Sequence, residues 1–208
     1  MTTQAFLSRL RLPWAALALA GSVACTDFLS VKNPNVIDVD EVDPVADATT
    51  LANSAQQNFA TAYGWQILHA SWFTGEAQVS ETFPTRNEFG RRDVQQSNGS
   101  LNANMWTPLT LASASTHLVL ELDLPNPTTN INYARSALWR GYSFVLMAEN
   151  FCTGTVESGP ELTAAIMLDS AVVNFTKAIT IGTANASAEA VALANPARVG
   201  RARAQLQA

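Results

Sequence analysis

Beyond residue 43, hydrophobic side chains recur at a spacing of three or four, which is the period of an α-helix. The clearest run predicts a helix that ends at Gly182, with its apolar face formed by Ala165, Leu168, Val172, Phe175 and Ile179. No segment alternates convincingly between apolar and polar residues, as a half-buried strand would. The pattern therefore predicts an all-α fold.

Helix caps and helix breakers divide the first part of this pattern. Asp43-Pro44 is typical of a helix start, and we expect that helix to end before Gly64. A second helix is expected over Trp65–Gln78. The polar stretch Val79–Asn98, which contains Pro84 and Gly90, is predicted to be a long loop, and such loops are often functional.

The second half of the chain predicts helices in consecutive pairs. We expect them over Leu101–Leu122 and Asn130–Phe151, then a short one over Ser187–Ala194 and another that opens at Asn195-Pro196. Paired helices of similar length suggest tetratricopeptide-like stacking, which presents a concave face and needs a cap at each end. Because the sequence stops at Ala208 within a predicted helix, without such a cap, we expect a truncated chain.

The N-terminal segment has the features of an export signal. Arg9 and Arg11 precede a short apolar run over Leu12–Ala20, and small residues lead to Cys25. The run is shorter than the roughly 20 residues that span a bilayer, so cleavage is expected. The small residues before Cys25 resemble a lipobox, in which the cysteine is lipidated; an ordinary secretory signal is the alternative.

This reading divides the chain into a lipoprotein signal peptide (1–24), an extended acidic tether after the lipidated cysteine (25–42) and a helical domain (43–208). The chain carries 12 basic and 17 acidic residues, a net charge of −5, which argues against a nucleic-acid partner. Loss of Arg9 and Arg11 leaves ten basic residues and a net charge of −7. With Cys25 lipidated, Cys152 has no partner and is expected to be a buried thiol.

Four short motifs, in this order, resemble the RagB/SusD family of nutrient-uptake outer-membrane lipoproteins. They are the stretches Cys25-Thr26-Asp27-Phe28-Leu29 with Asn33-Pro34, Met105-Trp106-Thr107-Pro108-Leu109, Ala134-Arg135-Ser136-Ala137-Leu138-Trp139-Arg140-Gly141-Tyr142 and Ala197-Arg198-Val199-Gly200-Arg201-Ala202-Arg203-Ala204. The resemblance covers nearly all of this chain but only the N-terminal half of a usual member.

The resemblance implies a lipid-anchored, surface-exposed protein of the bacterial outer membrane. Such a protein captures an oligosaccharide or peptide and closes as a lid over a TonB-dependent (SusC-like) receptor. A tetratricopeptide-like helical domain would pack against that receptor. Palmitate on Cys25 would provide the membrane anchor. A helical-repeat scaffold that binds another envelope protein, and no small ligand, is the second hypothesis.

Carbohydrate recognition requires aromatic faces and fixed polar groups in a concave site. Candidates cluster around the predicted loop, and the four selected as ligand-binding residues are Trp72, Glu76, Phe83 and Arg86, with Phe73, Glu81, Asn87 and Glu88 beside them. The alternative is that Trp72 belongs to the core and the polar residues are solvated. For Trp65, Trp106 and Trp139 we expect helix packing.

The sequence offers little support for catalysis or metal binding. Glu76 and Glu81 could form the acid and base pair of a glycosidase, but sequence alone does not fix their separation. No nucleophile elbow, phosphate-binding loop or dinucleotide fingerprint occurs. His69 and His117 have no companion at ligand spacing. We therefore expect a non-enzymatic protein without a metal or cofactor.

Overall fold

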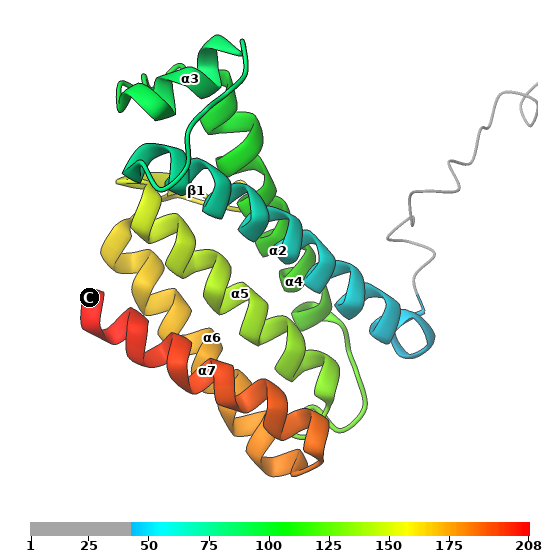
Figure 1. Cartoon of the computed structure of the whole chain (residues 1–208). Helices are drawn as coiled ribbons and strands as arrows, with labels where there is room; N and C mark the ends of the chain where they lie inside the picture. The colour runs from blue at the N-terminus through cyan, green and yellow to red at the C-terminus, as the bar shows by residue number, and fades with distance from the viewer. Residues whose placement is uncertain (1–42) are drawn as a thin grey trace, which may run out of the picture. The chain divides into compact units, whose positions relative to one another are not determined.

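The structure is a computed structural model that describes residues 43–208 of the chain. The predicted signal peptide, Cys25 and the acidic tether lie outside the described residues. The described part is mostly helical, which confirms the all-α prediction (Figure 1). Its elements, in chain order, are α2 (Pro44–Thr74), α3 (Pro84–Arg91), the π-helix η2 (Leu101–Trp106), α4 (Thr107–Glu121), α5 (Ile131–Asn150), β1 (Thr153–Thr155), β2 (Glu161–Thr163), α6 (Ala164–Asn185) and α7 (Ala188–Gln207).

Helix α2 is one continuous helix where the sequence predicted two. The Asp43 carboxylate caps its start, accepting hydrogen bonds from the first free backbone N–H groups. The helix passes through Gly64 because buried residues on both sides of this glycine, such as Phe59 and His69, hold it against the fold. It ends at Gly75, whose φ of +87° is the left-handed conformation that glycine adopts easily.

The predicted loop Val79–Asn98 contains a helix, so that part of the prediction is wrong. Helix α3 starts at Pro84, a residue suited to the first turn, and ends where Arg92 turns left-handed with a φ of 59°. Only Phe89 on α3 is buried. A single apolar residue leaves no periodic signal in the sequence, although it is sufficient to dock the helix.

The helix predicted over Leu101–Leu122 is confirmed in extent, but its first part is a π-helix. Segment η2 leads directly into α4, whose first turn contains Pro108. The side chain of Gln66 on α2 donates a hydrogen bond of 3.1 Å to the carbonyl of Met105 in η2. Short π-helical segments frequently occur at functional sites.

Helix α5 was predicted correctly and forms the centre of the main core. Asn130 caps its start, and its buried side chains include Leu138, Val145 and Met147. In Figure 1, α5, α6 and α7 lie side by side and alternate in direction. All three contribute to one hydrophobic core, together with Phe59 of α2 and Leu109 of α4.

Two breaks predicted in the last two helices do not occur. Gly182, expected to end its helix, lies inside α6, where a Cβ atom would come 2.6 Å from the carbonyl oxygen of Ala190. This glycine therefore permits close packing of α6 and α7 instead of terminating a helix. The segments predicted separately around Pro196 form the single helix α7. Small residues spaced three or four apart bury one face along its length: Ala190, Ala194, Ala197, Gly200 and Ala204.

A short β-hairpin between α5 and α6 was not predicted. Strands β1 and β2 pair antiparallel with Thr153 opposite Thr163, and three-residue strands are too short for an alternating pattern. Cys152, predicted to be buried, is exposed at the start of this hairpin. The prediction failed because the cysteine follows the end of α5, outside its buried face.

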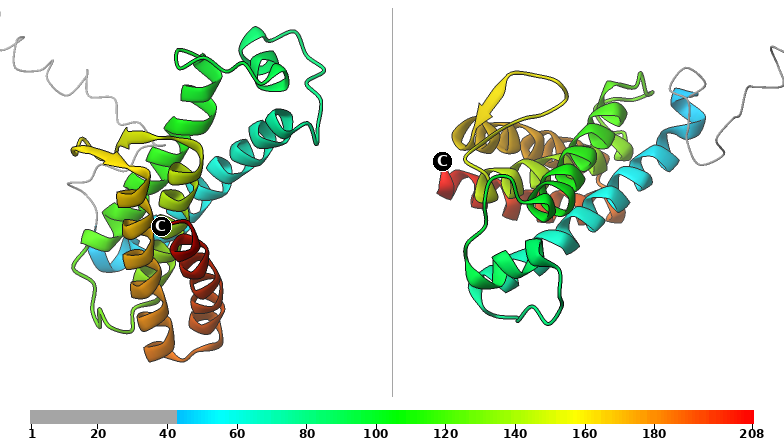
Figure 2. Two further views of the ribbon diagram at one scale, coloured as in Figure 1. Left: turned by 90° about the vertical axis from the view of Figure 1, so that its left-hand side faces the viewer. Right: turned by 90° about the horizontal axis from the view of Figure 1, so that it is seen from above.

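Helix α3 lies at the far end of α2, away from α6 and α7 (Figure 2). It docks through a small separate cluster of Trp72, Phe89 and Met105. Helix α6 is long and apolar enough to cross a membrane by length and composition alone, and it packs here against α5 and α7. The described chain thus has a central helical core and a smaller packed region at the end of α2.

Candidate ligand-binding site

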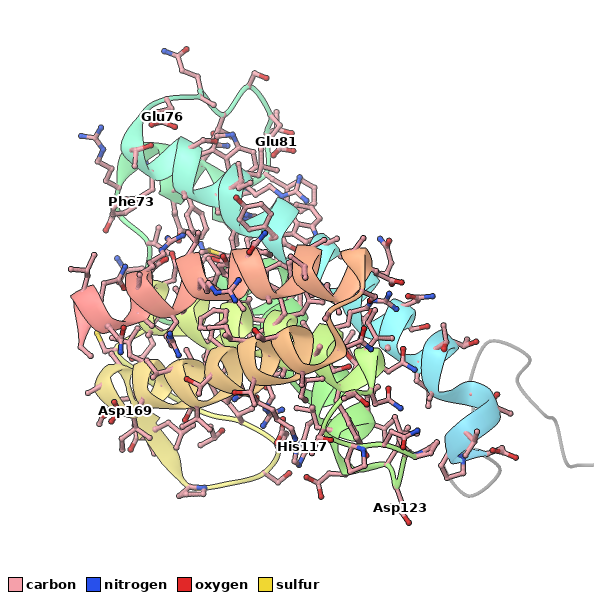
Figure 3. All side chains as sticks on the ribbon, turned by 90° about the horizontal axis from the view of Figure 1, so that it is seen from below. Phe73, Glu76, Glu81, His117, Asp123 and Asp169 are labelled. Atoms are coloured by element: carbon pink, nitrogen blue, oxygen red, sulfur yellow. The ribbon has the colours of Figure 1, made fainter. Side chains whose placement is uncertain are left out.

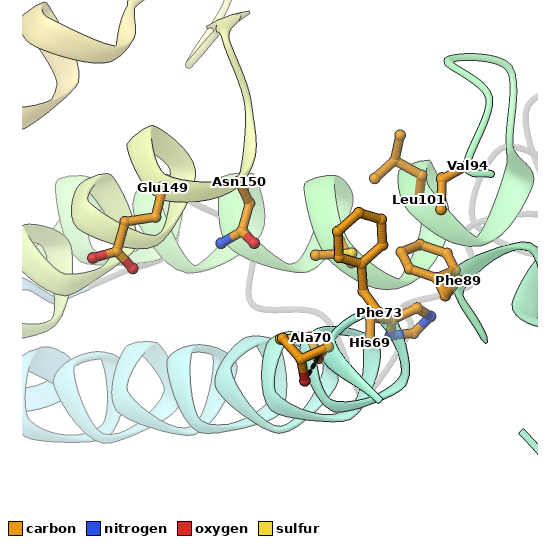
Figure 4. A pocket seen from close by; sticks show the side chains of 10 residues that line it. His69, Ala70, Phe73, Phe89, Val94, Leu101, Glu149 and Asn150 are labelled. Atoms are coloured by element: carbon orange, nitrogen blue, oxygen red, sulfur yellow. Dashed lines mark hydrogen bonds between the residues drawn. The ribbon is translucent and has the colours of Figure 1, made fainter. Parts of the chain in front are cut away.

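A cavity of about 460 Å³ lies where α2, α3, η2 and the end of α5 meet. Figure 4 shows Phe73, Phe89, Val94 and Leu101 gathered on one side of it, and Glu149 and Asn150 at the end of α5. Phe73 is 46% exposed, so its ring is available to a ligand. The full lining is His69, Ala70, Phe73, Thr74, Phe89, Val94, Leu101, Met105, Glu149 and Asn150.

His69 is the most buried polar residue of this cavity, with no exposed surface. Its Nδ1 lies 2.9 Å from the carbonyl oxygen of Trp65. Because a carbonyl only accepts, Nδ1 carries the proton, and Nε2 of the neutral ring is left as an acceptor. That Nε2 has no hydrogen-bond partner in the described chain.

The surroundings of His69 favour its neutral form. Burial lowers the pKa of the imidazole, and the positive charge of Arg86 acts in the same direction. The Trp65 carbonyl and the carboxylate of Glu81 oppose this shift, but the net pKa lies below the ordinary value. The ring also makes edge contacts with Trp72 and Phe89, at centroid distances of 4.9 and 4.6 Å.

A cation–aromatic cluster lies beside the cavity. The guanidinium carbon of Arg86 is 5.0 Å from the ring centre of Phe83 and 5.6 Å from that of Trp65. Its Nη1 also donates to both carboxylate oxygens of Glu81, at 3.0 and 3.1 Å. Asn87 donates to the carbonyls of Glu81 and Phe83, which fixes the start of α3. This cluster contains two of the four selected residues.

The four selected residues therefore do not form one site. Phe83 is 58% exposed and its ring faces the guanidinium group of Arg86. Trp72, in contrast, is 7% exposed and packs with Phe89 and Met105. That burial matches the alternative in which Trp72 belongs to the core. Figure 3 shows Glu76 and Glu81 near the end of α2, and Glu76 is exposed.

A second cavity of about 460 Å³ lies between α2, α5 and α7. Phe59 and Trp139 stack at its base with ring centres 4.9 Å apart, and the Tyr142 hydroxyl donates to the carbonyl of Pro196 at 2.8 Å. Trp139 and Trp106 both pack against the main core, as expected for packing residues. Tyr63, at the mouth of this cavity, is exposed.

The sequence did not identify most of the first cavity. The sequence raises His69 only as a possible metal ligand, and it gives no signal for Phe89, Glu149 or Asn150 as site residues. The spacing of His69 and Phe73, one helical turn apart, was the one local signal. Within residues 43–208, no group of three or more His, Cys, Asp or Glu side chains is arranged to hold a metal ion.

Comparison with known proteins gives no match among family models, curated proteins or solved structures.

Proposed function

We propose that this chain belongs to a non-catalytic lipoprotein of the bacterial outer membrane, which captures a nutrient and delivers it to a TonB-dependent receptor. The nutrient is an oligosaccharide or a peptide, and lipidated Cys25 is the anchor. In this proposal the helices that follow one another in alternating direction are tetratricopeptide-like and form the receptor-facing part. The receptor is proposed from the resemblance of the four motifs to the RagB/SusD family.

The observation that carries ligand capture is the first cavity. It combines an apolar lining with a few polar groups, among them the unpartnered Nε2 of His69, and this combination is typical of small-molecule sites. Phe73 and Phe83 add exposed aromatic faces at the same end of the molecule. The proposal does not require catalysis by any of these residues.

The test is capture of the receptor. The tagged chain, expressed in its native host, should co-purify a TonB-dependent receptor encoded beside its gene. A matched preparation of the Cys25→Ser variant, which cannot be lipidated, should yield much less of it. Recovery of no such receptor from the wild-type preparation would contradict the delivery role.

Lipidation can be measured separately. We expect radiolabelled palmitate to enter the wild-type chain and not Cys25→Ser, because the thiol of residue 25 would be the attachment point. Equal incorporation into both chains would exclude Cys25 as the anchor. Cys152→Ser is the matched control and should incorporate label normally.

A scaffold without a small ligand is the second candidate, and the second cavity favours it. Its lining is largely apolar and includes the exposed ring of Tyr63 on α2 and Pro196 on α7. Such a face suits contact with a protein partner. Receptor capture abolished by Tyr63→Ala, together with no binding of any nutrient, would favour this second candidate.

A further inference from the structure

The first and second cavities lie along the same pair of helices. Both are lined by residues of α2 and α5, and α7 contributes to the second. Helix α5 lies between α2 and α7 and contacts both of them (Figure 1). Each cavity has a volume of about 460 Å³. The α2–α5 face, as we call the side chains that line the two cavities and those between them, therefore offers two similar cavities in a row.

Helical spacing places the exposed lining residues of both cavities on one strip of α2. Ala60 and Tyr63 line the second cavity, and Ala70 and Thr74 line the first. Ile67, which is 50% exposed, lies between the two pairs. Steps of three or four residues separate these positions, so their side chains share one side of the helix. The lining residues of α5 follow the same spacing, and they are Trp139, Tyr142, Leu146, Glu149 and Asn150.

The charged side chains beside the two cavities are already engaged within the fold. The Glu149 carboxylate accepts two hydrogen bonds from Arg203, at 2.7 and 2.6 Å. The Arg92 guanidinium donates to the backbone carbonyls of Phe73 and Thr74. After its first turn, α2 itself carries no Asp, Glu, Lys or Arg. An uncharged ligand therefore suits the α2–α5 face better than an ion does.

Three exposed amide side chains provide neutral polar contacts on this side of the molecule. Gln56 lines the second cavity, and Asn150 lines the first. Asn150 donates one N–H to the carbonyl of Leu146, and Gln207 of α7 donates one to Glu149. A primary amide has two N–H groups and a carbonyl oxygen, so Asn150 and Gln207 keep a further donor and an acceptor. The peptide bond also offers one donor and one acceptor, which such amides can satisfy.

The separation of the cavities fits an extended peptide. At about 1.5 Å per helical residue, their lining residues on α2 and α5 place the cavities about 10–20 Å apart. An extended chain advances about 3.3 Å per residue, and alternate side chains point to the same side. Side chains four residues apart are therefore about 13 Å apart and on the same side, so one can enter each cavity.

We propose that the α2–α5 face binds a neutral, extended peptide through two apolar side chains four residues apart, one in each cavity. The second cavity takes an aromatic side chain, because its lining contains the rings of Phe59, Tyr63, Trp139 and Tyr142. This inference rests on the proposed capture function and selects a peptide as the ligand. An oligosaccharide fits less well, because two largely apolar cavities offer few partners to its many hydroxyl groups.

The test compares two isomeric peptides by titration calorimetry with the full chain at neutral pH. Each is an acetylated and amidated heptapeptide of two phenylalanines and five serines. In the first the phenylalanines stand at the second and sixth positions, and in the second at the second and fifth, which point to opposite sides of an extended chain. The first should bind at least about tenfold more tightly, since the second can bury only one ring.

Three outcomes would overturn the proposal. They are equal affinities for the two isomers, no saturable binding of the first isomer, and tighter binding of cellopentaose than of either peptide. The last of these would assign the α2–α5 face to an oligosaccharide instead.

Two variants locate the interaction by filling one cavity at a time. Ala60→Trp fills the second cavity and Ala70→Trp the first, and both positions are exposed, so no core side chain is removed. Each variant should weaken the first isomer about tenfold, to the level of the second. Thr61→Trp is the matched control, because this exposed residue of α2 lines neither cavity, and it should leave the affinity unchanged. Unaltered affinity in both cavity-filling variants would refute the site.

Failure here is distinguishable from failure of the proposed function. Receptor capture is measured without these peptides. A chain that captures the receptor but does not discriminate between the two isomers would disprove only the ligand class.

Discussion

Phe175 connects three helices at a single position. Its ring, on α6, lies against Gly141 of α5 and Gly200 of α7. A Cβ atom at Gly141 would come 2.7 Å from the ring, and one at Gly200 would clash with it as well. Both glycines are therefore required by the close approach of the ring, and neither is a helix breaker.

Substitution of a helical glycine by alanine should lower the stability where the glycine is tightly packed and raise it where the glycine has free space. Gly141→Ala and Gly200→Ala should each destabilise the fold by about 1–3 kcal/mol, because the added methyl group overpacks the Phe175 contact. Gly64→Ala, where nothing lies within 4 Å, should instead stabilise it by up to about 1 kcal/mol through helix propensity. Urea unfolding followed by circular dichroism measures all three, and stabilisation at Gly141 would contradict the packing.

His69 should make stability depend on pH. Since burial holds the folded-state pKa below 6.5, the unfolded chain binds more protons as the pH falls through 6.5. Stability should therefore fall below pH 6.5 and level off below the folded-state pKa. Urea unfolding from pH 7.5 to 5 should show this loss in the wild type and a smaller one in His69→Phe. Parallel curves would show that His69 is not responsible.

At the scale of elements, an ion pair ties the β1–β2 hairpin to α5, beside the buried Val156 of the hairpin turn. Arg140 on α5 donates to Glu157 in the hairpin turn, at 2.6 and 3.0 Å, and also to the carbonyl of Ser113 on α4. Burial raises the pKa of Glu157. The hydrogen bonds and charge of Arg140, together with His117 and Ser113, lower it by a larger amount, so the net pKa lies below its ordinary value. The carboxylate is consequently charged well into the acidic range.

Arg140→Ala should release the hairpin. The substitution removes the charged donor from the part-buried Glu157 carboxylate, which keeps only the Ser113 hydroxyl, and we expect a loss of about 1–3 kcal/mol. Hydrogen exchange should rise most over Thr153–Thr163. Arg198→Ala, which removes hydrogen bonds to exposed partners, is the control. Its free energy of unfolding should stay within about 0.5 kcal/mol of the wild-type value.

In the wild type, the same release of the hairpin should occur as the pH falls below 4.5, because Glu157, whose folded-state pKa is lowered, then loses its charge.

Much of the helical arrangement could be predicted from the sequence. The apolar residues that recur every three or four positions in α5 and α6 are the ones that pack into the main core. The errors at Gly64, Gly182 and Pro196 share one cause: tertiary packing outweighs a local penalty of about 1–3 kcal/mol. Helix α3 was missed because its only buried side chain is Phe89.

The candidate site was harder to predict than the fold. Phe83 and Arg86 lie close in sequence, and the structure does bring them together. His69 and Glu149 come from different helices and line one cavity, which no local spacing encodes. The aromatic ring of Trp72 suggests a ligand-binding residue, but helical periodicity places that ring on the buried side of α2.

At the scale of the whole molecule, residues 43–208 form a compact unit with its own core. A chain that begins at Asp43 should therefore fold without residues 1–42. We expect a helical circular dichroism spectrum and a single cooperative urea transition, as for small single domains. A gradual, non-cooperative loss of helix would contradict an independent unit. Retention of Asp43 matters because its carboxylate caps α2.

The docking of α3 at the far end of α2 has a consequence for motion. Its release would expose the small cluster of Trp72, Phe89 and Met105 with the side chains packed on it, whereas separation of α5, α6 and α7 would disrupt the larger main core. Local opening is easiest where little apolar surface is buried, so backbone amides of α3 should exchange with solvent long before those of α5. Phe89 on one wall of the first cavity thus belongs to the part of the molecule that we expect to open first. Glu149 and Asn150 on another wall belong to α5, which we expect to open last, so a captured ligand should enter and leave beside α3.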